Sequence, residues 1–216
     1  MSLTPIGAAL SEVLRWLPPG MPGKARLARL LLGSCLQAQD VQLHTRYGCT
    51  FVVPSLCEPI GFHLLVDGIY EVEAVEFVLG RLRAGAVFVD VGANIGVFTL
   101  PAATKVGPTG HVLAIEPSPG IFSYLRQNVM LNGLSNVRLR QCAASDRSVT
   151  TIPFWEAPIE HFGMGALAAQ FHADPIAVPA QTLDDILGEE SIEQVDLLKM
   201  DVEGFKRLSC KEPGSC

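Results

Sequence analysis

The pattern of apolar and polar positions predicts strands and helices in alternation. Val87–Val91 is a continuous β-branched and aromatic apolar run, which is the pattern of a strand buried on both faces. An apolar helix is expected at 95–105, with Gly92 and Gly96 in the turn between the two. Further strands are expected at 111–116, 137–143 and 195–200, and further helices at 69–83 and 117–131. This alternation predicts βαβ units, and therefore an α/β fold with a doubly wound, mostly parallel sheet.

Two segments interrupt the alternation. The first 66 residues predict two short helices followed by a small β-meander: helices at 5–17 and 23–33, then strands at 41–45, 49–53 and 61–66. The second of these helices is basic and amphipathic; docking on its own domain is the ordinary role of such a helix, and a membrane-surface role is the alternative. The other interruption, at 147–181, predicts strands at 150–155 and 176–178 beside the carboxyl ends of the sheet.

The glycine turn has the properties of a ligand site. A strand that enters a helix through such a turn brings backbone N–H groups and a helix N-terminus to one point, and the missing β-carbons let a ligand lie against the chain. A dinucleotide loop has the pattern G-x-G-x-x-G, but Asn94 stands where its second glycine would be. Asp90 ends the strand, where it would face a pyrophosphate badly and a ligand ammonium well. S-adenosylmethionine carries an ammonium, a sulfonium and a carboxylate, so these two residues favour it over a dinucleotide.

Acidic residues also end two other predicted strands. Glu116 lies about 20 residues past the glycine turn, where a carboxylate accepts both ribose hydroxyl protons of either cofactor. Asp201 ends the strand at 195–200, whose tip is expected beside Val87–Val91; the alternative is a carboxylate that satisfies nearby backbone N–H groups. A base near an acceptor hydroxyl would help to remove its proton. The candidates are Asp201, Glu203, His161 and His172, and no spacing singles one out.

Five blocks of the chain, in order, resemble the FkbM-type family of S-adenosylmethionine-dependent methyltransferases. The blocks are 87–99 (VFVDVGANIGVFT), 114–118 (AIEPS), 143–146 (AASD), 182–187 (TLDDIL) and 196–205 (DLLKMDVEGF), and Gly68–Glu71 resembles the family's G-x-Y-E lead-in. The resemblance implies a class I methyltransferase (Rossmann-like) fold, S-adenosyl-L-methionine as cofactor, and a hydroxyl of a small molecule or sugar as acceptor. The residues that it places around the cofactor are Asp90, Gly92, Ala93, Asn94, Gly96, Glu116, Ser145, Asp146 and Asp201.

The resemblance also divides the chain. We expect an N-terminal part at 1–66, a cofactor-binding methyltransferase core at 67–205 and an atypical tail at 206–216. Family members continue with a helix and further strands, which would need on the order of 50 more residues, so the chain is expected to be truncated or frame-shifted at its carboxyl end. The strand at 195–200 would then lie at an open edge, available for self-association. Besides an active O-methyltransferase, the alternatives are a truncated, inactive cofactor-binding chain and an NAD-dependent oxidoreductase, which Asn94 disfavours.

Composition narrows the partners. The formal net charge is −6 and the chain has only 16 Lys and Arg, which argues against nucleic acid as a principal partner. No apolar run approaches 18 residues, and the first residues lack the pattern of a secretory signal, so a cytoplasmic protein without a transmembrane segment is expected. The six cysteines show no zinc spacing, which predicts reduced thiols and no metal site.

Overall fold

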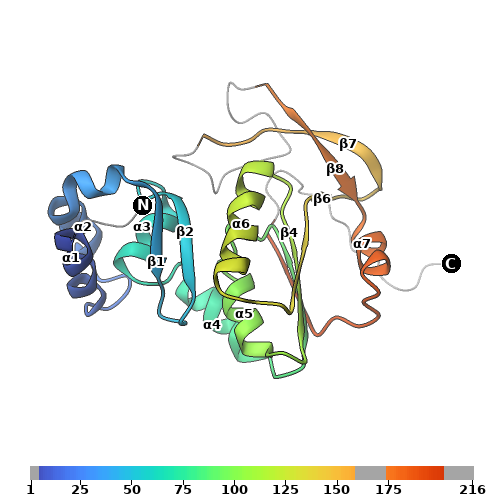
Figure 1. Cartoon of the computed structure of the whole chain (residues 1–216), viewed down its shortest axis with the longest axis horizontal. Helices are drawn as coiled ribbons and strands as arrows, with labels where there is room; N and C mark the ends of the chain where they lie inside the picture. Colours follow the sequence, from blue (N-terminus) through green and yellow to red (C-terminus); the bar gives the residue numbers. More distant parts are fainter. Residues whose placement is uncertain (1–4, 159–173, 202–216) are drawn as a thin grey trace.

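A four-stranded parallel sheet forms the centre of the protein (Figure 1). The computed structural model describes residues 5–158 and 174–201. The strands lie in the order β5 (Val137–Arg140), β4 (His111–Ile115), β3 (Val87–Val91) and β9 (Leu197–Met200), and all of their pairings are parallel. The predicted parallel α/β sheet is confirmed, and β3 occupies an inner position with a partner on each side.

Both faces of this sheet are covered. Helices α4 (Val72–Arg81), α5 (Thr99–Val106) and α6 (Pro119–Leu131) cover one face, and α7 (Leu183–Glu189) covers the other. Phe88 of β3 packs on the first side, whereas Val89 and Val91 pack against Ile186 of α7. All three β3 side chains are at most 1 % exposed, as expected for a continuous apolar strand of a doubly wound sheet.

The N-terminal segment packs onto the first of these faces. It consists of α1 (Pro5–Arg15), α2 (Lys24–Leu32), the 3₁₀ turn η1 (Gly33–Gln37), the hairpin of β1 (Gln39–His44) and β2 (Thr50–Ser55), and α3 (Pro59–Val66). The two predicted N-terminal helices and the first two strands are confirmed. One continuous hydrophobic cluster runs from Leu14 of α1 through Phe51 of β2 to Val129 of α6. The N-terminal segment therefore shares its core with the parallel sheet.

The third strand of the predicted β-meander, at 61–66, is wrong, because these residues belong to α3. Glu58 caps this helix by accepting the N–H groups of Ile60 and Gly61, and Pro59 stands in its first turn. Six of the eight helical residues are buried. A short run that is apolar on every side has no period, so its sequence does not distinguish a buried strand from a buried helix.

The predicted strand at 137–143 is two strands in two sheets. It stops at Arg140 and resumes as β6 (Ala143–Ala144), which pairs with β8 (Ile176–Gln181); β8 in turn pairs with β7 (Val149–Phe154). The predicted helix at 95–105 begins only at Thr99, because the residues before it form turns. These differences do not move the carboxyl ends of β3 and β4.

Two asparagines of α6 attach the hairpin to the core. The buried Asn128 side chain accepts the N–H of Val52 at 2.7 Å and donates to the carbonyls of Val52 (3.3 Å) and Ile95 (2.9 Å). One turn later, Asn132 accepts the N–H of Thr50 at 2.8 Å and donates to its carbonyl at 2.6 Å. The amides thus satisfy the edge of β2 that does not face β1, and Asn128 also holds the turn after β3.

We expect Asn128→Leu to lower the free energy of unfolding by about 2–4 kcal/mol, because it leaves buried backbone groups of Val52 and Ile95 without partners. Urea denaturation followed by circular dichroism measures the change. Gln127→Ala, at the exposed neighbouring position, is the control and should change stability by less than about 0.5 kcal/mol. Equal stability of the two variants would show that the amide does not fasten the hairpin.

Candidate cofactor site

The carboxyl ends of β3, β4 and β9 meet around Gly92. Asp201, directly after β9, donates its backbone N–H to the carbonyl of Val91 at 3.0 Å. Gly92 has a φ of +75°, and a β-carbon at this position would lie 2.0 Å from the carbonyl oxygen of Asp201. Glycine is therefore required here by the protein's own backbone, in addition to any need of a ligand for a close approach.

The N–H groups of the glycine turn are used inside the protein. Those of Gly92 and Ala93 both donate to the carbonyl of Ile115, at 2.9 and 3.0 Å. Asn94, with a φ of +52°, donates its N–H to Glu116 and accepts the N–H of Ile95 on its side chain. The expectation that this turn brings backbone N–H groups together for a ligand is therefore wrong for its first four residues, 92–95, whose N–H groups are bonded within the protein.

Gly96 makes room for packing. Its φ is +98°, and a β-carbon at this position would lie 2.5 Å from Cδ1 of Leu100 and 3.0 Å from Cδ1 of Leu125, which is too close. The absence of a side chain therefore lets α5 and α6 approach the turn. This position supports the shape of the site from behind.

Glu116 links the second strand end to this turn. Its carboxylate accepts the N–H of Asn94 at 2.9 Å on one oxygen and the N–H of Ser118 at 2.9 Å on the other. Burial raises the pKa of Glu116 to about 7, although both N–H groups and the Lys199 ammonium favour the charged form. Each oxygen uses one of its lone pairs for these bonds, so the carboxylate keeps the capacity to accept two hydroxyl groups.

Asp90 is fully buried and faces a cation of the protein itself. One carboxylate oxygen accepts the hydroxyl of Thr99 at 2.6 Å. The Lys199 ammonium lies 3.2 Å from the other oxygen of Asp90, which has no hydrogen bond of good geometry within the described chain. The same ammonium donates a hydrogen bond to the carbonyl of Gly92 at 2.9 Å. The position in which a ligand ammonium was expected is thus shared with Lys199.

Lys199 is the residue of this site that sequence reasoning missed. It stands directly opposite Asp90 in the parallel register of β3 and β9. Its ammonium also lies 4.8 Å from the centre of the Phe98 ring and 4.0 Å from the carboxylate of Asp201. The available signal was a single lysine inside an otherwise apolar strand, LLKM, since such a residue needs a buried partner.

The charge around the three strand ends favours a cationic ligand. Three carboxylates, those of Asp90, Glu116 and Asp201, surround the single ammonium of Lys199 in this part of the described chain. Asp201 is the accessible member, with a side chain that is 65 % exposed. When all four groups are ionised the cluster carries a net negative charge, which attracts cations into the site.

The remaining expected site residues are less closely connected. Ser145 and Asp146 follow β6; the Ser145 hydroxyl donates to Asp146 at 3.3 Å, and the N–H of Ser145 donates to the carbonyl of Gln181. No hydrogen bond joins this pair to Glu116 in the described chain. The candidate bases Glu203, His161 and His172 lie outside the described residues.

Two further carboxylates, those of Glu58 and Glu71, lie around Tyr70, close to Asp201. Burial and the neighbouring carboxylates of Glu71, Glu58 and Asp201 raise the pKa of Tyr70 to about 12. Burial also raises the pKa of Glu58 to about 7, despite the two N–H groups that it caps. The G-x-Y-E stretch that led into the sequence resemblance thus lies beside the end of β9.

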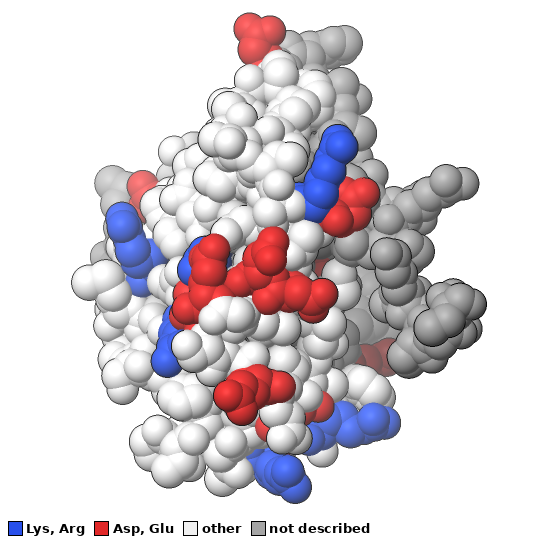
Figure 2. Space-filling view, turned by 90° about the vertical axis from the view of Figure 1, so that its right-hand side faces the viewer, with Lys and Arg blue, Asp and Glu red and all other residues white. Residues whose placement is uncertain are grey.

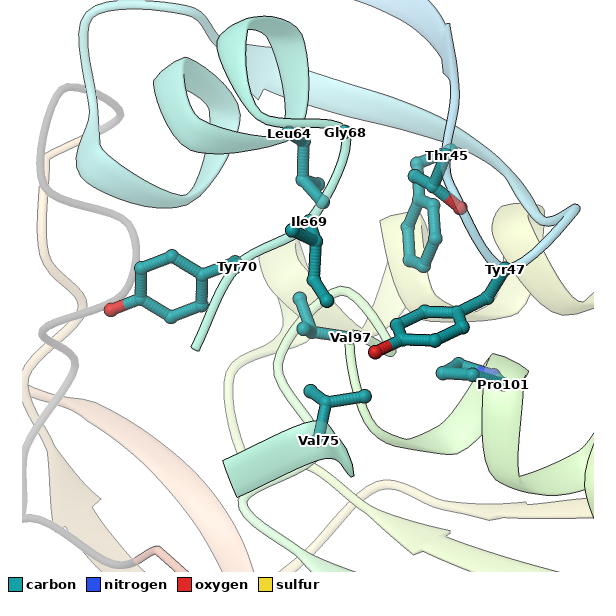
Figure 3. Close-up of a pocket in the computed structure, with 10 residues that line it drawn as sticks. Thr45, Tyr47, Leu64, Gly68, Ile69, Tyr70, Val75, Val97 and Pro101 are labelled. Carbon is teal, nitrogen blue, oxygen red and sulfur yellow. The ribbon is translucent and has the colours of Figure 1, made fainter. Parts of the chain in front are cut away.

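A small apolar pocket beside this group is a packing gap. It is lined by residues of the hairpin, α3, α4 and α5 (Figure 3). The Tyr47 hydroxyl points into it without a hydrogen-bond partner in the described chain, whereas the Tyr70 hydroxyl points away. Ligand pockets are usually larger and carry several convergent polar groups, so we place the candidate site at the strand ends.

The fold is an open parallel α/β sheet, and the candidate site lies at the carboxyl ends of its inner strands, between a glycine turn and an acidic residue of the next strand. These two features are typical of the class of α/β proteins that bind a ligand at this edge of the sheet. Comparison with known families assigns the chain within this class. The model of the methyltransferase FkbM domain matches residues 90–206, which is more than half of the chain. The chain belongs to the methyltransferase FkbM domain family.

Curated relatives agree with this assignment. The chain is 31 % identical to "Methyltransferase sdnD" of Sordaria araneosa, over 58 % of this chain and 60 % of the relative. It is 30 % identical to "31-O-demethyl-FK506 methyltransferase FkbM" of Streptomyces tacrolimicus, over 59 % of each chain. The chain thus spans about 60 % of the length of these relatives. Among solved structures, M. jannaschii TYW2 in complex with AdoMet is 28 % identical over 49 % of this chain and 45 % of that chain, with a TM-score of 0.36.

A methyltransferase domain of this type takes its methyl group from S-adenosylmethionine, and the residues at the strand ends fit this cofactor. Glu116 retains two acceptor positions for ribose hydroxyls. Asp90 has a buried oxygen without a hydrogen bond, and the excess of carboxylates suits a ligand with two positive groups. A ligand ammonium at Asp90 has to share that carboxylate with Lys199.

We expect Lys199→Met to lower the free energy of unfolding by about 3–5 kcal/mol, because it leaves the fully buried Asp90 charge without its cation. The double variant Asp90→Asn, Lys199→Met should recover most of this loss. Urea denaturation of the wild type, both single variants and the double variant gives the coupling energy of the pair.

Lys105→Met on α5 removes an exposed lysine and serves as the control. Its stability should stay within about 0.5 kcal/mol of the wild type. Additive effects of the Asp90 and Lys199 substitutions would contradict the pairing.

Proposed function

We propose that this chain is the cofactor-binding part of an S-adenosylmethionine-dependent methyltransferase that methylates a hydroxyl oxygen of a small molecule or a sugar. The observation that carries the proposal is the connection between Glu116 and the glycine turn through the N–H of Asn94. This bond fixes a carboxylate with spare acceptor capacity at the end of β4, beside a turn with asparagine where a dinucleotide loop has glycine. The family match covers the same residues.

Each group of the site has a separate role in this proposal. Glu116 accepts the ribose hydroxyls, and Asp90 and Asp201 hold the positive end of the cofactor. The Phe98 ring, which already faces the Lys199 ammonium, is an apolar surface that tolerates a cation. The cofactor supplies an electrophilic methyl group on a sulfonium. The chain has to exclude water from this group and align the acceptor oxygen behind it.

A base has to remove the proton of the acceptor hydroxyl. Of the four candidates Asp201, Glu203, His161 and His172, only Asp201 lies in the described chain, at the end of β9 and close to Lys199. Its exposure leaves room for an acceptor beside it. Ser145 and Asp146 remain proposed cofactor contacts on the strength of the sequence resemblance.

The name of one relative supports oxygen as the acceptor. The name of the Streptomyces tacrolimicus protein describes methylation of a 31-O-demethyl compound, which is transfer to an oxygen. A carboxylate base suits an aliphatic hydroxyl, because that group has to lose its proton as the methyl group arrives. That nucleic acid is not the acceptor remains a prediction from the net charge of −6.

Self-association through β9 also remains a proposal. In the described chain β9 pairs with β3 alone, and its Leu198 and Met200 side chains are each 41 % exposed. An unpaired strand edge with exposed apolar side chains is a surface on which a second chain can add a strand.

The cofactor assignment predicts that the chain binds S-adenosylhomocysteine more tightly than NAD in calorimetric titration.

Glu116→Gln should weaken the binding of S-adenosylhomocysteine by about 1–3 kcal/mol, because a neutral amide loses charge-assisted bonds to the ribose. Since the pKa of Glu116 is about 7, its ionised form increases between pH 6 and pH 8, and the affinity of the wild type should rise by up to about tenfold over this range. The affinity of Glu116→Gln should change much less with pH. Tighter binding of NAD would contradict the assignment.

The acceptor assignment predicts transfer of a labelled methyl group to compounds with a free aliphatic hydroxyl and no transfer to their O-methyl ethers. Asp201→Asn should lower kcat by at least about 100-fold, the usual contribution of a general base, and should also raise KM for the cofactor, because the Asp201 charge helps to hold its positive end. Cofactor binding without transfer to any hydroxyl compound would favour the alternative of an inactive cofactor-binding chain. Transfer to a nitrogen acceptor alone would contradict O-methylation.

A further inference from the structure

Exposed apolar side chains are concentrated on the two N-terminal helices. In the described chain, large apolar residues with high exposure on or between α1 and α2 are Ile6, Val13, Trp16, Met21, Leu27, Leu30 and Leu31. Trp16 is 89 % exposed, Leu30 79 % and Ile6 75 %. The other five such residues are distributed over α4, α6 and β9. We call the surface formed by the seven N-terminal residues the N-terminal apolar face.

These side chains do not contribute to the hydrophobic core. The core-facing side of α1 is formed by Leu14, and that of α2 by Ala28 and Leu32, each at most 2 % exposed. The exposed residues of α2 lie on another side of the helix, where Leu27 is followed by Leu30 and Leu31 at helical spacing. Both helices are thus apolar on an outward side as well as toward the core. Exposed apolar side chains that gather on two helices in contact with each other mark an interaction site.

Basic side chains accompany the N-terminal apolar face. The stretch from α1 to α2 carries four basic residues and one acidic residue, in a chain whose formal net charge is −6. Lys24 is buried in an ion pair with Asp67, at 2.6 Å, whereas Arg26 and Arg29 are exposed on α2 beside the leucines. Arg29 also lies over the ring of Phe62, at 5.1 Å, which holds its side chain along the surface of the helix.

The acidic residues gather elsewhere. Figure 2 shows a group of carboxylates on the α7 side of the protein, the side opposite to α1 and α2 in Figure 1. Exposed acidic residues on and just after α7 are Asp184, Asp185, Glu189 and Glu193. The protein therefore has one basic and apolar end and one acidic side, an arrangement that orients it toward a negatively charged surface.

We infer that the N-terminal apolar face docks on a lipid bilayer that contains anionic lipids. Trp16, Leu30 and their neighbours would enter the boundary between headgroups and acyl chains, and Arg26 and Arg29 would meet the lipid phosphates. Tryptophan suits this boundary because its ring is apolar and its N–H is polar. No described helix is long and apolar enough to span a membrane, and α1 and α2, with 11 and 9 residues, fit a location parallel to the bilayer surface. This inference is independent of the proposed methyl transfer.

Flotation with lipid vesicles tests the inference. The 216-residue chain should float with vesicles of phosphatidylcholine mixed with phosphatidylglycerol, and much less with vesicles of phosphatidylcholine alone. Arg26→Glu, Leu30→Ser should reduce the bound fraction at limiting lipid by at least about tenfold, because it reverses one charge and removes a large apolar side chain from the face.

Helix α6 offers a matched control. Arg126 and Met130 have the same i, i+4 spacing as Arg26 and Leu30, and Met130 is 74 % exposed, which is close to the 79 % of Leu30. Arg126→Glu, Met130→Ser should leave flotation unchanged. Circular dichroism verifies that both double variants keep the fold of the wild type.

Fluorescence gives a second readout. In a Trp155→Phe background Trp16 is the single tryptophan, and its emission should shift to the blue when anionic vesicles are added. No flotation of the folded wild type, or equal loss in both double variants, would overturn the inference. It would also be overturned if the wild type formed dimers in sedimentation that only Arg26→Glu, Leu30→Ser abolished, without vesicle binding. The face would then be an interface between copies of the chain.

Discussion

The side-chain amide of Asn128 is the interaction on which the arrangement of this protein depends. It lies fully buried in α6, between the edge of β2 and the turn that follows β3. A side chain that satisfies a strand edge and a turn at once fixes both against the same helix, since either group would be unpaired if the other moved. The N-terminal hairpin, the glycine turn and α6 therefore form one unit. The N-terminal hairpin and α6 therefore help the strands of the parallel sheet to fix the position of the candidate site.

The site itself is a balance between carboxylates and one ammonium. Asp90 is tolerated at the centre of the sheet because Thr99 and Lys199 reach it, and Glu116 is tolerated because two backbone N–H groups donate to it. The raised pKa of Glu116 shows that this compensation is incomplete. Groups held in this way stabilise the fold little, and this suits residues whose charges are needed by a ligand.

Much of this arrangement could be predicted from the sequence, because the inner strands of a doubly wound sheet are continuous apolar runs. Val87–Val91 and the strand before Glu116 were located by that pattern, and both acidic residues were found at the strand ends. Where the pattern carries no period, prediction failed. The apolar run at 61–66 became helix α3, because the cap formed by Glu58 and Pro59 decided the outcome.

What the sequence could not show were contacts between distant residues. Lys199 was missed because its partner Asp90 is 109 positions away, and only the pairing of β3 with β9 brings them together. The sequence also could not show why position 92 has to be glycine, because the atom that a β-carbon there would meet is the carbonyl oxygen of the distant residue Asp201. The free donors expected in the glycine turn were already bonded to Ile115 and Glu116, which no local pattern reveals. The contacts of the cofactor itself stay predictions.

The pair of Asp90 and Lys199 has a consequence for the alignment of the last strand. Alternate residues of β9 face opposite sides of the sheet, so a slip of one position would turn the Lys199 ammonium toward the apolar layer of Val89, Val91 and α7. No carboxylate of β3 faces that layer, and an unpaired ammonium there is strongly unfavourable. Apolar strands give little information about alignment, because Leu197, Leu198 and Met200 are large apolar side chains that could replace one another in several positions. A single lysine among them therefore acts as a register mark, and the charge that helps to shape the site also decides how the strand is placed beside β3.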